Sequence, residues 1–181
     1  CLIVATLLAL CATSHAQIPR WPGKPVRVIV PVSPGGGTDI MARTLATKLS
    51  EEYGQAFVID NRGGGGGTIG AETTVRAAPD GYTLAVMGGS YAANAALYKL
   101  PYDAVRDITP ISILGTGPFV IAVHPSVKAA TLKELIELAR ARPNALAYGS
   151  SGVGSTLHLA GELFRQMSKT ELLHVPYKGG G

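Results

Sequence analysis

The stretch Pro34-Gly35-Gly36-Gly37-Thr38-Asp39 decides the fold, because it joins a β-branched apolar run directly to a helical pattern. The run before it, Val26–Val30, is typical of a buried strand. Residues 38–52 follow it, with apolar side chains at helical spacing along one face. A strand that passes through a short glycine turn into a helix indicates a parallel α/β unit.

The same strand–turn–helix pattern recurs at two other places. Gly88-Gly89-Ser90 follows an apolar run at 82–87, and the turn Gly149–Ser155 follows another at 146–148. The remaining predicted strands are 56–60, 108–114, 119–124 and 172–175, and the remaining predicted helices are 68–77, 91–98, 131–142 and 156–167. Strands alternate with helices throughout, so we expect an α/β fold with parallel sheets.

The three Gly/Ser turns belong at one edge of such a sheet, since ligands of α/β folds lie at the carboxyl ends of the strands. Each turn exposes backbone N–H groups at the positive end of a helix, which favours an anion. We therefore expect a carboxylate or phosphate held by the backbone. The predicted ligand-binding residues are Pro34, Gly35, Gly36, Gly37, Thr38, Asp39, Ser90, Ser150, Ser151, Gly154 and Ser155.

Asp39 is the most informative charged residue, and two roles are open for it. It lies in the first turn of a helix, where a negative charge is favourable, and Arg43 stands at i+4 as an ion-pair partner. Alternatively its carboxylate accepts a hydrogen bond from a ligand amine, hydroxyl or water. A ligand anion should meet the glycine N–H groups instead, because Asp39 would repel it. The serines of the turns could each be only turn or cap residues.

Composition excludes several classes of protein. The 181 residues are 46% hydrophobic and 15% charged, which is typical of a globular chain. The formal charge of +4 is modest and no basic run is present, so nucleic-acid binding is not expected. Residues 1–16 carry no Asp, Glu, Lys or Arg and end in Ser14-His15-Ala16, which is typical of the end of a cleaved secretory signal peptide. Both cysteines lie in this segment, so a mature chain starting at residue 17 would have no disulfide, as in a bacterial periplasmic protein.

Two other functions are weighed. A secreted serine hydrolase would use Ser90, Ser151 or Ser155 with His158, but neither candidate Ser turn has the second glycine of Gly-x-Ser-x-Gly. A nicotinamide-dependent oxidoreductase would use the glycines of the segment Gly65–Gly70, but the acidic ribose partner is missing after the next strand. No residues have metal-ligand spacing, and we expect no cofactor, no metal and no catalysis.

The sequence resembles the periplasmic solute-binding proteins of the tripartite tricarboxylate transporter type, the Bug family. Ordered matches over most of the chain carry the resemblance: Val30-Pro31, Pro34–Asp39, Ala42-Arg43, Asp60-Asn61-Arg62, Ile69–Glu72, Pro79–Leu84, Leu97-Tyr98, Pro101–Asp103, Asp107, Lys133–Leu135, Tyr148–Ser150, Gly154-Ser155, His158-Leu159 and His174–Gly179. The family usually has an alanine within the glycine run, which here is unbroken over Gly63–Gly67, and an aromatic residue where this chain has Val32.

The resemblance implies a two-domain Venus-flytrap fold of periplasmic binding proteins, with residues 17–114 in the first domain and 115–181 in a truncated second one. It implies that a small mono-, di- or tricarboxylate is bound in the interdomain cleft, with one carboxyl group on the 34–39 and 149–155 turns. It further implies delivery to membrane permease subunits. We expect a monomer, and we expect the chain to be a fragment that lacks its C-terminal part.

Overall fold

The computed structural model describes residues 20–177, and the predicted leader with both cysteines lies outside the described residues. In chain order the elements are β1 (Val26–Val30), α2 (Gly37–Tyr53), β2 (Phe57–Asn61), η2 (Gly65–Gly67), α3 (Thr68–Val75), β3 (Thr83–Ala85), α4 (Ser90–Leu97), α5 (Leu132–Ala141), β4 (Ala147–Ser150), α6 (Thr156–Ser168) and β5 (Leu173–Pro176). Strands and helices alternate, as predicted, and every strand pairing among them is parallel.

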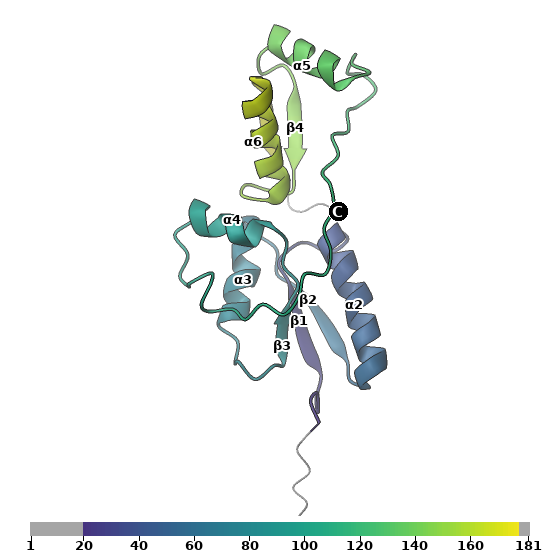
Figure 1. Ribbon diagram of the computed structural model, residues 1–181, viewed down its shortest axis with the longest axis vertical. Coiled ribbons are helices and arrows are strands. Elements are labelled where there is room, and N and C mark those ends of the chain that lie inside the picture. The colour runs from purple at the N-terminus through teal and green to yellow at the C-terminus, as the bar shows by residue number, and fades with distance from the viewer. Residues whose placement is uncertain (1–19, 178–181) are drawn as a thin grey trace, which may run out of the picture.

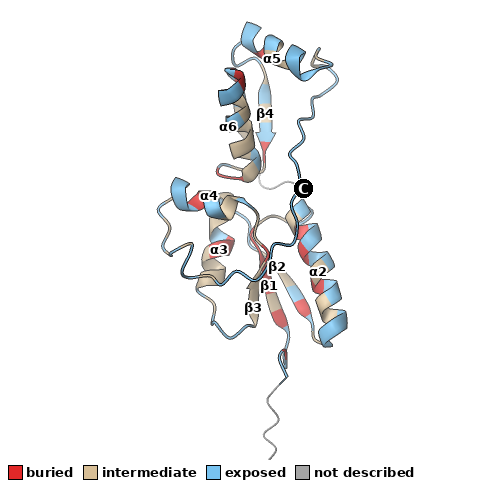
Figure 2. Ribbon diagram, viewed as in Figure 1, coloured by how far each residue is buried: buried red, intermediate tan, exposed pale blue. Residues whose placement is uncertain are grey.

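The first sheet has the order β2-β1-β3, and we call this part, residues 26–98, the three-stranded unit. Figure 1 shows the sheet between α2 on one side and α3 on the other. Because β1 is the central strand, its four apolar side chains are buried, on both faces of the sheet (Figure 2). The core of the unit combines β1 with small residues of α2 and single residues of neighbouring segments: Val26, Val28, Val30, Ala42, Ala46, Phe57 and Val86. Apolar burial of this kind drives folding.

Local signals explain where the helices of this unit start and stop. α2 ends at Tyr53 because Gly54 adopts a left-handed conformation (φ 65°) and donates its N–H to the Ser50 carbonyl. At the other end α2 begins at Gly37, directly after the glycine turn. The turn residues therefore stand at the carboxyl end of β1, as the sequence predicts.

The second sheet pairs β4 with β5, and we call residues 131–177 the two-stranded unit. The start of α5 has the spacing of a capping box: Thr131 Oγ1 accepts a hydrogen bond from the Glu134 N–H (3.2 Å), and Glu134 Oε2 accepts one from the N–H of the preceding residue, Ala130 (2.7 Å). α6 packs so closely on β4 that a Cβ placed on Gly161 would lie 2.2 Å from Tyr148 Cε2.

The predicted strands at 108–114 and 119–124 are wrong. The structure shows neither strand nor helix there, and nearly all of these side chains face solvent, with Ile113 83% and Val120 84% exposed. An apolar β-branched run becomes a strand only when another strand supplies hydrogen-bond partners. Neither sheet among residues 20–177 includes a strand from this segment.

Gly70→Ala should lower the free energy of unfolding by about 1–3 kcal/mol. Gly70 lies in α3 where the helix touches the end of β1, and an added Cβ would lie 2.6 Å from Pro31 Cβ and 2.9 Å from the Arg62 carbonyl oxygen. Urea unfolding followed by circular dichroism measures the loss. Gly37→Ala is the matched control, because its Cβ would meet nothing within 4 Å. Equal stabilities of the two variants would contradict the prediction.

Candidate functional site

The helix α2 begins within the turn at residues 34–39, and its N-cap residue provides no side-chain cap. Gly36 occupies the N-cap position and, having no side chain, makes no side-chain cap hydrogen bond. The N-cap residues of α3 and α4 are Gly67 and Gly89, and these helices also begin without a side-chain cap. A helix start without a cap leaves its N–H groups and its positive dipole end available to an anion. α5 and α6 differ, since Thr131 and Ser155 cap them.

Asp39 points into the protein, where three donors occupy its carboxylate. Oδ2 accepts hydrogen bonds from the Gly35 N–H (2.9 Å) and from Arg43 Nε (2.8 Å), and Oδ1 accepts one from Asn61 Nδ2 (2.8 Å). The side chain is 2% exposed. The Arg43 hydrogen bond, helped by the Gly35 N–H, holds the pKa of Asp39 far below its usual value, against the effect of burial. The predicted ion pair with Arg43 is confirmed, and Asp39 fixes the shape of the glycine turn.

The three predicted turns lie close together. A Cβ placed on Gly88 would lie 3.8 Å from Thr38 Oγ1, which brings the second turn beside the first. A Cβ on Gly89 would lie 3.2 Å from Thr156 Cγ2, at the start of α6. Figure 1 shows the loop before α6 facing α4 across the space between the two units. The site residues predicted from the sequence therefore converge from both units.

Two direct contacts join the units at this place. The Tyr98 hydroxyl donates to the Val153 carbonyl oxygen (3.2 Å), and a Cβ on Gly66 would lie 2.8 Å from that same oxygen. Asn94, which is 1% exposed, donates through Nδ2 to the Gly66 carbonyl oxygen (3.0 Å). Its Oδ1 has no hydrogen-bond partner among residues 20–177. The glycine run Gly63–Gly67 is thus tied to α4 through Gly66.

Sequence reasoning did not single out Asn94 and Tyr98. Tyr98 directly follows the last residue of α4, Leu97, but a signal was present for Asn94, which stands four residues after Ser90 on that helix. Residues at this spacing share one helix face. Ser90 itself is half-buried at the start of that helix, and its Oγ lies 3.8 Å from the Cβ position of Gly67.

The third turn is held from inside by side chains of its own unit. Ser150, 5% exposed, lies with Oγ 2.7 Å from His174 Nε2, and it accepts a hydrogen bond from the Gly152 N–H (3.2 Å). Ser155 Oγ caps α6 by accepting from the His158 N–H (3.2 Å), so its cap role is confirmed. His158 Nδ1 in turn accepts from the Gly154 N–H (3.2 Å). Ser151 is half-buried beside these residues.

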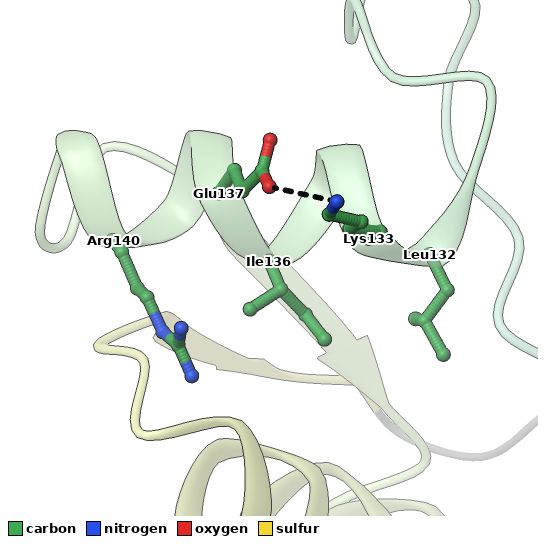
Figure 3. Close-up of a pocket in the computed structure, with 5 residues that line it drawn as sticks. All are labelled: Leu132, Lys133, Ile136, Glu137 and Arg140. Atoms are coloured by element: carbon green, nitrogen blue, oxygen red, sulfur yellow. Dashed lines mark ion pairs between the residues drawn. The ribbon is translucent and has the colours of Figure 1, made fainter.

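A hollow of about 520 Å³ lies elsewhere, along α5. Figure 3 shows Leu132, Ile136 and Arg140 directed to one side of the helix, with the Lys133–Glu137 ion pair (3.9 Å) at its edge. In Figure 1, α5 lies at the end of the two-stranded unit that is remote from α4. This hollow is therefore separate from the three turns and takes none of the predicted site residues.

Residues 20–177 contain neither a metal-binding cluster nor a membrane-spanning helix. No three His, Cys, Asp or Glu side chains gather in a way that could hold a metal ion. Within the same range, every helix is too short or too polar to cross a bilayer.

Comparison with known proteins matches residues 41–181 to the model of the tripartite tricarboxylate transporter family receptor, TctC. Among curated proteins, the chain is 39% identical over 186 residues to protein BugT of Bordetella pertussis, covering 99% of this chain and 57% of BugT. The chain thus spans about half the length of the curated relatives that it matches.

Similar solved structures agree. One described as a periplasmic transporter has a TM-score of 0.81 and 44% identity, and covers 89% of this chain and 55% of that one. Rpa4515 of Rhodopseudomonas palustris, solved with adipate, has a TM-score of 0.77 and 43% identity over 88% of this chain and 54% of its own. MatC of the same species, solved with bound malate, has a TM-score of 0.80 and 32% identity, and the match covers 88% of this chain and 55% of MatC.

These relatives are periplasmic solute-binding proteins, and two of the solved structures hold carboxylates. They confirm the resemblance and the periplasmic-binding-protein fold class, and they give no support to the serine-hydrolase alternative. The two-sheet α/β arrangement and the family match point the same way. The chain belongs to the tripartite tricarboxylate transporter receptor family of periplasmic solute-binding proteins.

Proposed function

We propose that this protein captures a small dicarboxylate between its two units and carries no catalytic activity. The observation that supports this most directly is the convergence of uncapped helix starts, α2 and α4, opposite the turn at 150–155. Backbone N–H groups at these positions can bind a carboxylate without any reactive side chain. The ligand-binding residues are those predicted from the sequence: Pro34, Gly35, Gly36, Gly37, Thr38, Asp39, Ser90, Ser150, Ser151, Gly154 and Ser155.

The relatives guide the choice of ligand. Adipate and malate, which two similar structures hold, both carry two carboxyl groups. One carboxylate of such a ligand would lie on the uncapped start of α2, with Asp39 turned away from it and paired with Arg43. A site whose donors are main-chain amides selects the anionic group, and the walls around it select the chain between the two groups.

We assign the protein to the periplasm, with residues 1–16 as a cleaved leader. Residues 17–114 would form the first domain and 115–181 part of the second, and closure of the two around the ligand would present the loaded protein to permease subunits in the membrane. The protein would act as a monomer. Family membership and the uncharged leader-like segment support these assignments.

The full-length protein should bind adipate with a Kd of about 10 μM or tighter, measured by isothermal titration calorimetry at pH 7.5. Malate, citrate and a monocarboxylate complete the panel. Adipamide, which has the length of adipate without its charges, is the matched control and should give no heat, since neutral amides gain nothing from helix dipoles. If no carboxylate of the panel gave a heat of binding, the proposed function would be wrong.

A further inference from the structure

Two histidines lie in ring-to-ring contact directly behind the third turn. His158 on α6 and His174 on β5 have ring centroids 4.2 Å apart at an interplanar angle of 24°. His174 also stacks on Tyr148 of β4, with centroids 4.9 Å apart. Each histidine contacts the turn differently. His158 accepts a hydrogen bond from the Gly154 N–H. His174 is hydrogen-bonded to the Ser150 hydroxyl, which accepts a hydrogen bond from the Gly152 N–H.

The contact of His158 with the turn specifies its protonation state. The Gly154 N–H is a donor, so Nδ1 must carry a lone pair, and the neutral ring must carry its proton on Nε2. The His174 contact is less restrictive, because either Nε2 or the Ser150 hydroxyl can supply the shared proton. Protonation of His158 therefore breaks its hold on Gly154, whereas protonation of His174 does not by itself break its own contact.

The charged and titratable groups around the pair offer protonated His158 another partner. Glu162, one turn along α6, lies with Oε1 4.0 Å from His158 Nε2. Glu162 Oε1 also accepts from the Tyr148 hydroxyl (2.5 Å), and its carboxylate pairs with Arg165 (2.8 Å). Burial and the neighbouring His158 lower the pKa of His174, which disfavours two charged rings in contact. A protonated His158 thus gains an ion pair with Glu162 and loses its hydrogen bond from the Gly154 N–H.

We propose that His158, stacked on His174, is a positioning residue that holds the third binding turn in shape only as a neutral imidazole, so that carboxylate capture weakens in acid. The inference rests on the proposed function for the identity of the ligand. The bound state, with the turn held, disfavours protonation of His158. The affinity is therefore expected to be higher at pH 7.5 than at pH 5.5.

The test compares the full-length wild type with His158→Asn by calorimetry with adipate at pH 7.5 and 5.5. Asparagine Oδ1 can take the place of Nδ1 as acceptor but does not titrate near neutrality. The variant should bind nearly as the wild type does at pH 7.5. Between the two pH values, the wild type should lose about tenfold more affinity than the variant. Protonation of adipate itself affects both proteins equally and cancels in the comparison.

His124→Asn is the matched control, because His124 contacts Ser126 in the exposed segment before α5 (2.8 Å) and should leave the wild-type pH profile unchanged. His158→Leu, checked for folding by circular dichroism, should bind weakly at both pH values. Identical pH profiles of wild type and His158→Asn would overturn the inference.

A ligand-free measurement separates this inference from the proposed function. Nitrogen NMR of the imidazoles should show His158 as the Nε2–H tautomer at pH 7.5, and a ring protonated on Nδ1 would overturn the contact with Gly154. If no carboxylate binds while this tautomer is present, the ligand assignment fails and the affinity effect fails with it, but the histidine contact stands.

Discussion

Asp39→Ala is expected to weaken dicarboxylate binding by at least about thirtyfold and to lower the free energy of unfolding by about 2–4 kcal/mol. The variant leaves the Gly35 N–H and the Asn61 amide without their shared acceptor. Arg43 keeps its hydrogen bond to Asn61 Oδ1 (3.0 Å) but loses the one to the carboxylate. Without these bonds the glycine turn loses the conformation that aims the N–H groups of α2 at the ligand. Calorimetry with adipate gives the first quantity and urea unfolding gives the second.

Asp80→Ala is the matched control for this prediction. Asp80 is a half-exposed carboxylate of the same unit, which binds the Tyr82 N–H (3.0 Å) and lies 3.7 Å from Lys24 Nζ. Since it is remote from the three turns, its loss should leave adipate binding within about twofold of wild type. Equal affinities of the two variants would remove Asp39 from the site.

The lowered pKa of Asp39 also predicts a dependence of stability on pH. A carboxyl group whose folded pKa is depressed stabilises the folded state above the unfolded pKa, about 3.9 for aspartate, and this stabilisation is lost as the pH falls further. Wild type should therefore lose more of its advantage over Asp39→Asn below about pH 4 than between pH 5 and 8. The melting temperatures of both proteins, measured from pH 8 down to pH 3, test this. A difference between them that stays constant over the whole range would contradict the prediction.

Gly154→Ala is expected to raise the Kd for the dicarboxylate by roughly ten- to a hundredfold. Gly154 has φ 79°, a conformation that favours glycine, and an added Cβ would lie 2.6 Å from the Tyr98 hydroxyl oxygen. Tyr98 belongs to the other unit, so the clash acts against the arrangement in which the units meet around the ligand. The measurement is calorimetry with adipate, after a check that the variant melts cooperatively.

Two further variants identify the cause of that loss. Gly117→Ala adds the same methyl group where nothing lies within 4 Å, and it should bind as wild type does. The double variant Gly154→Ala/Tyr98→Ala should recover part of the affinity lost by Gly154→Ala, because the clash is removed. Strictly additive losses would show that Tyr98 does not limit the approach of the turn.

Much of the three-stranded unit could be predicted because its signals are local. The β-branched run of β1, the glycine turn and the apolar face of α2 follow one another within a single stretch, and Gly54 ends the helix by its own conformation. The apolar runs at 108–114 and 119–124 wrongly predict strands, because strand formation depends on more than local sequence. Their composition is that of strands, but a strand also depends on a partner edge, and composition does not reveal one.

The candidate site divides in the same way. Sequence by itself determined the fold class and the glycine turns with their exposed helix starts, because turn conformation and helix capping depend on neighbouring residues. Only the tertiary structure decided that Asp39 turns inward to Asn61, that Asn94 reaches Gly66, and that His174 lies against His158 behind the third turn. These contacts join residues from separate elements, and their geometry follows from how sheets and helices pack, which no local pattern encodes.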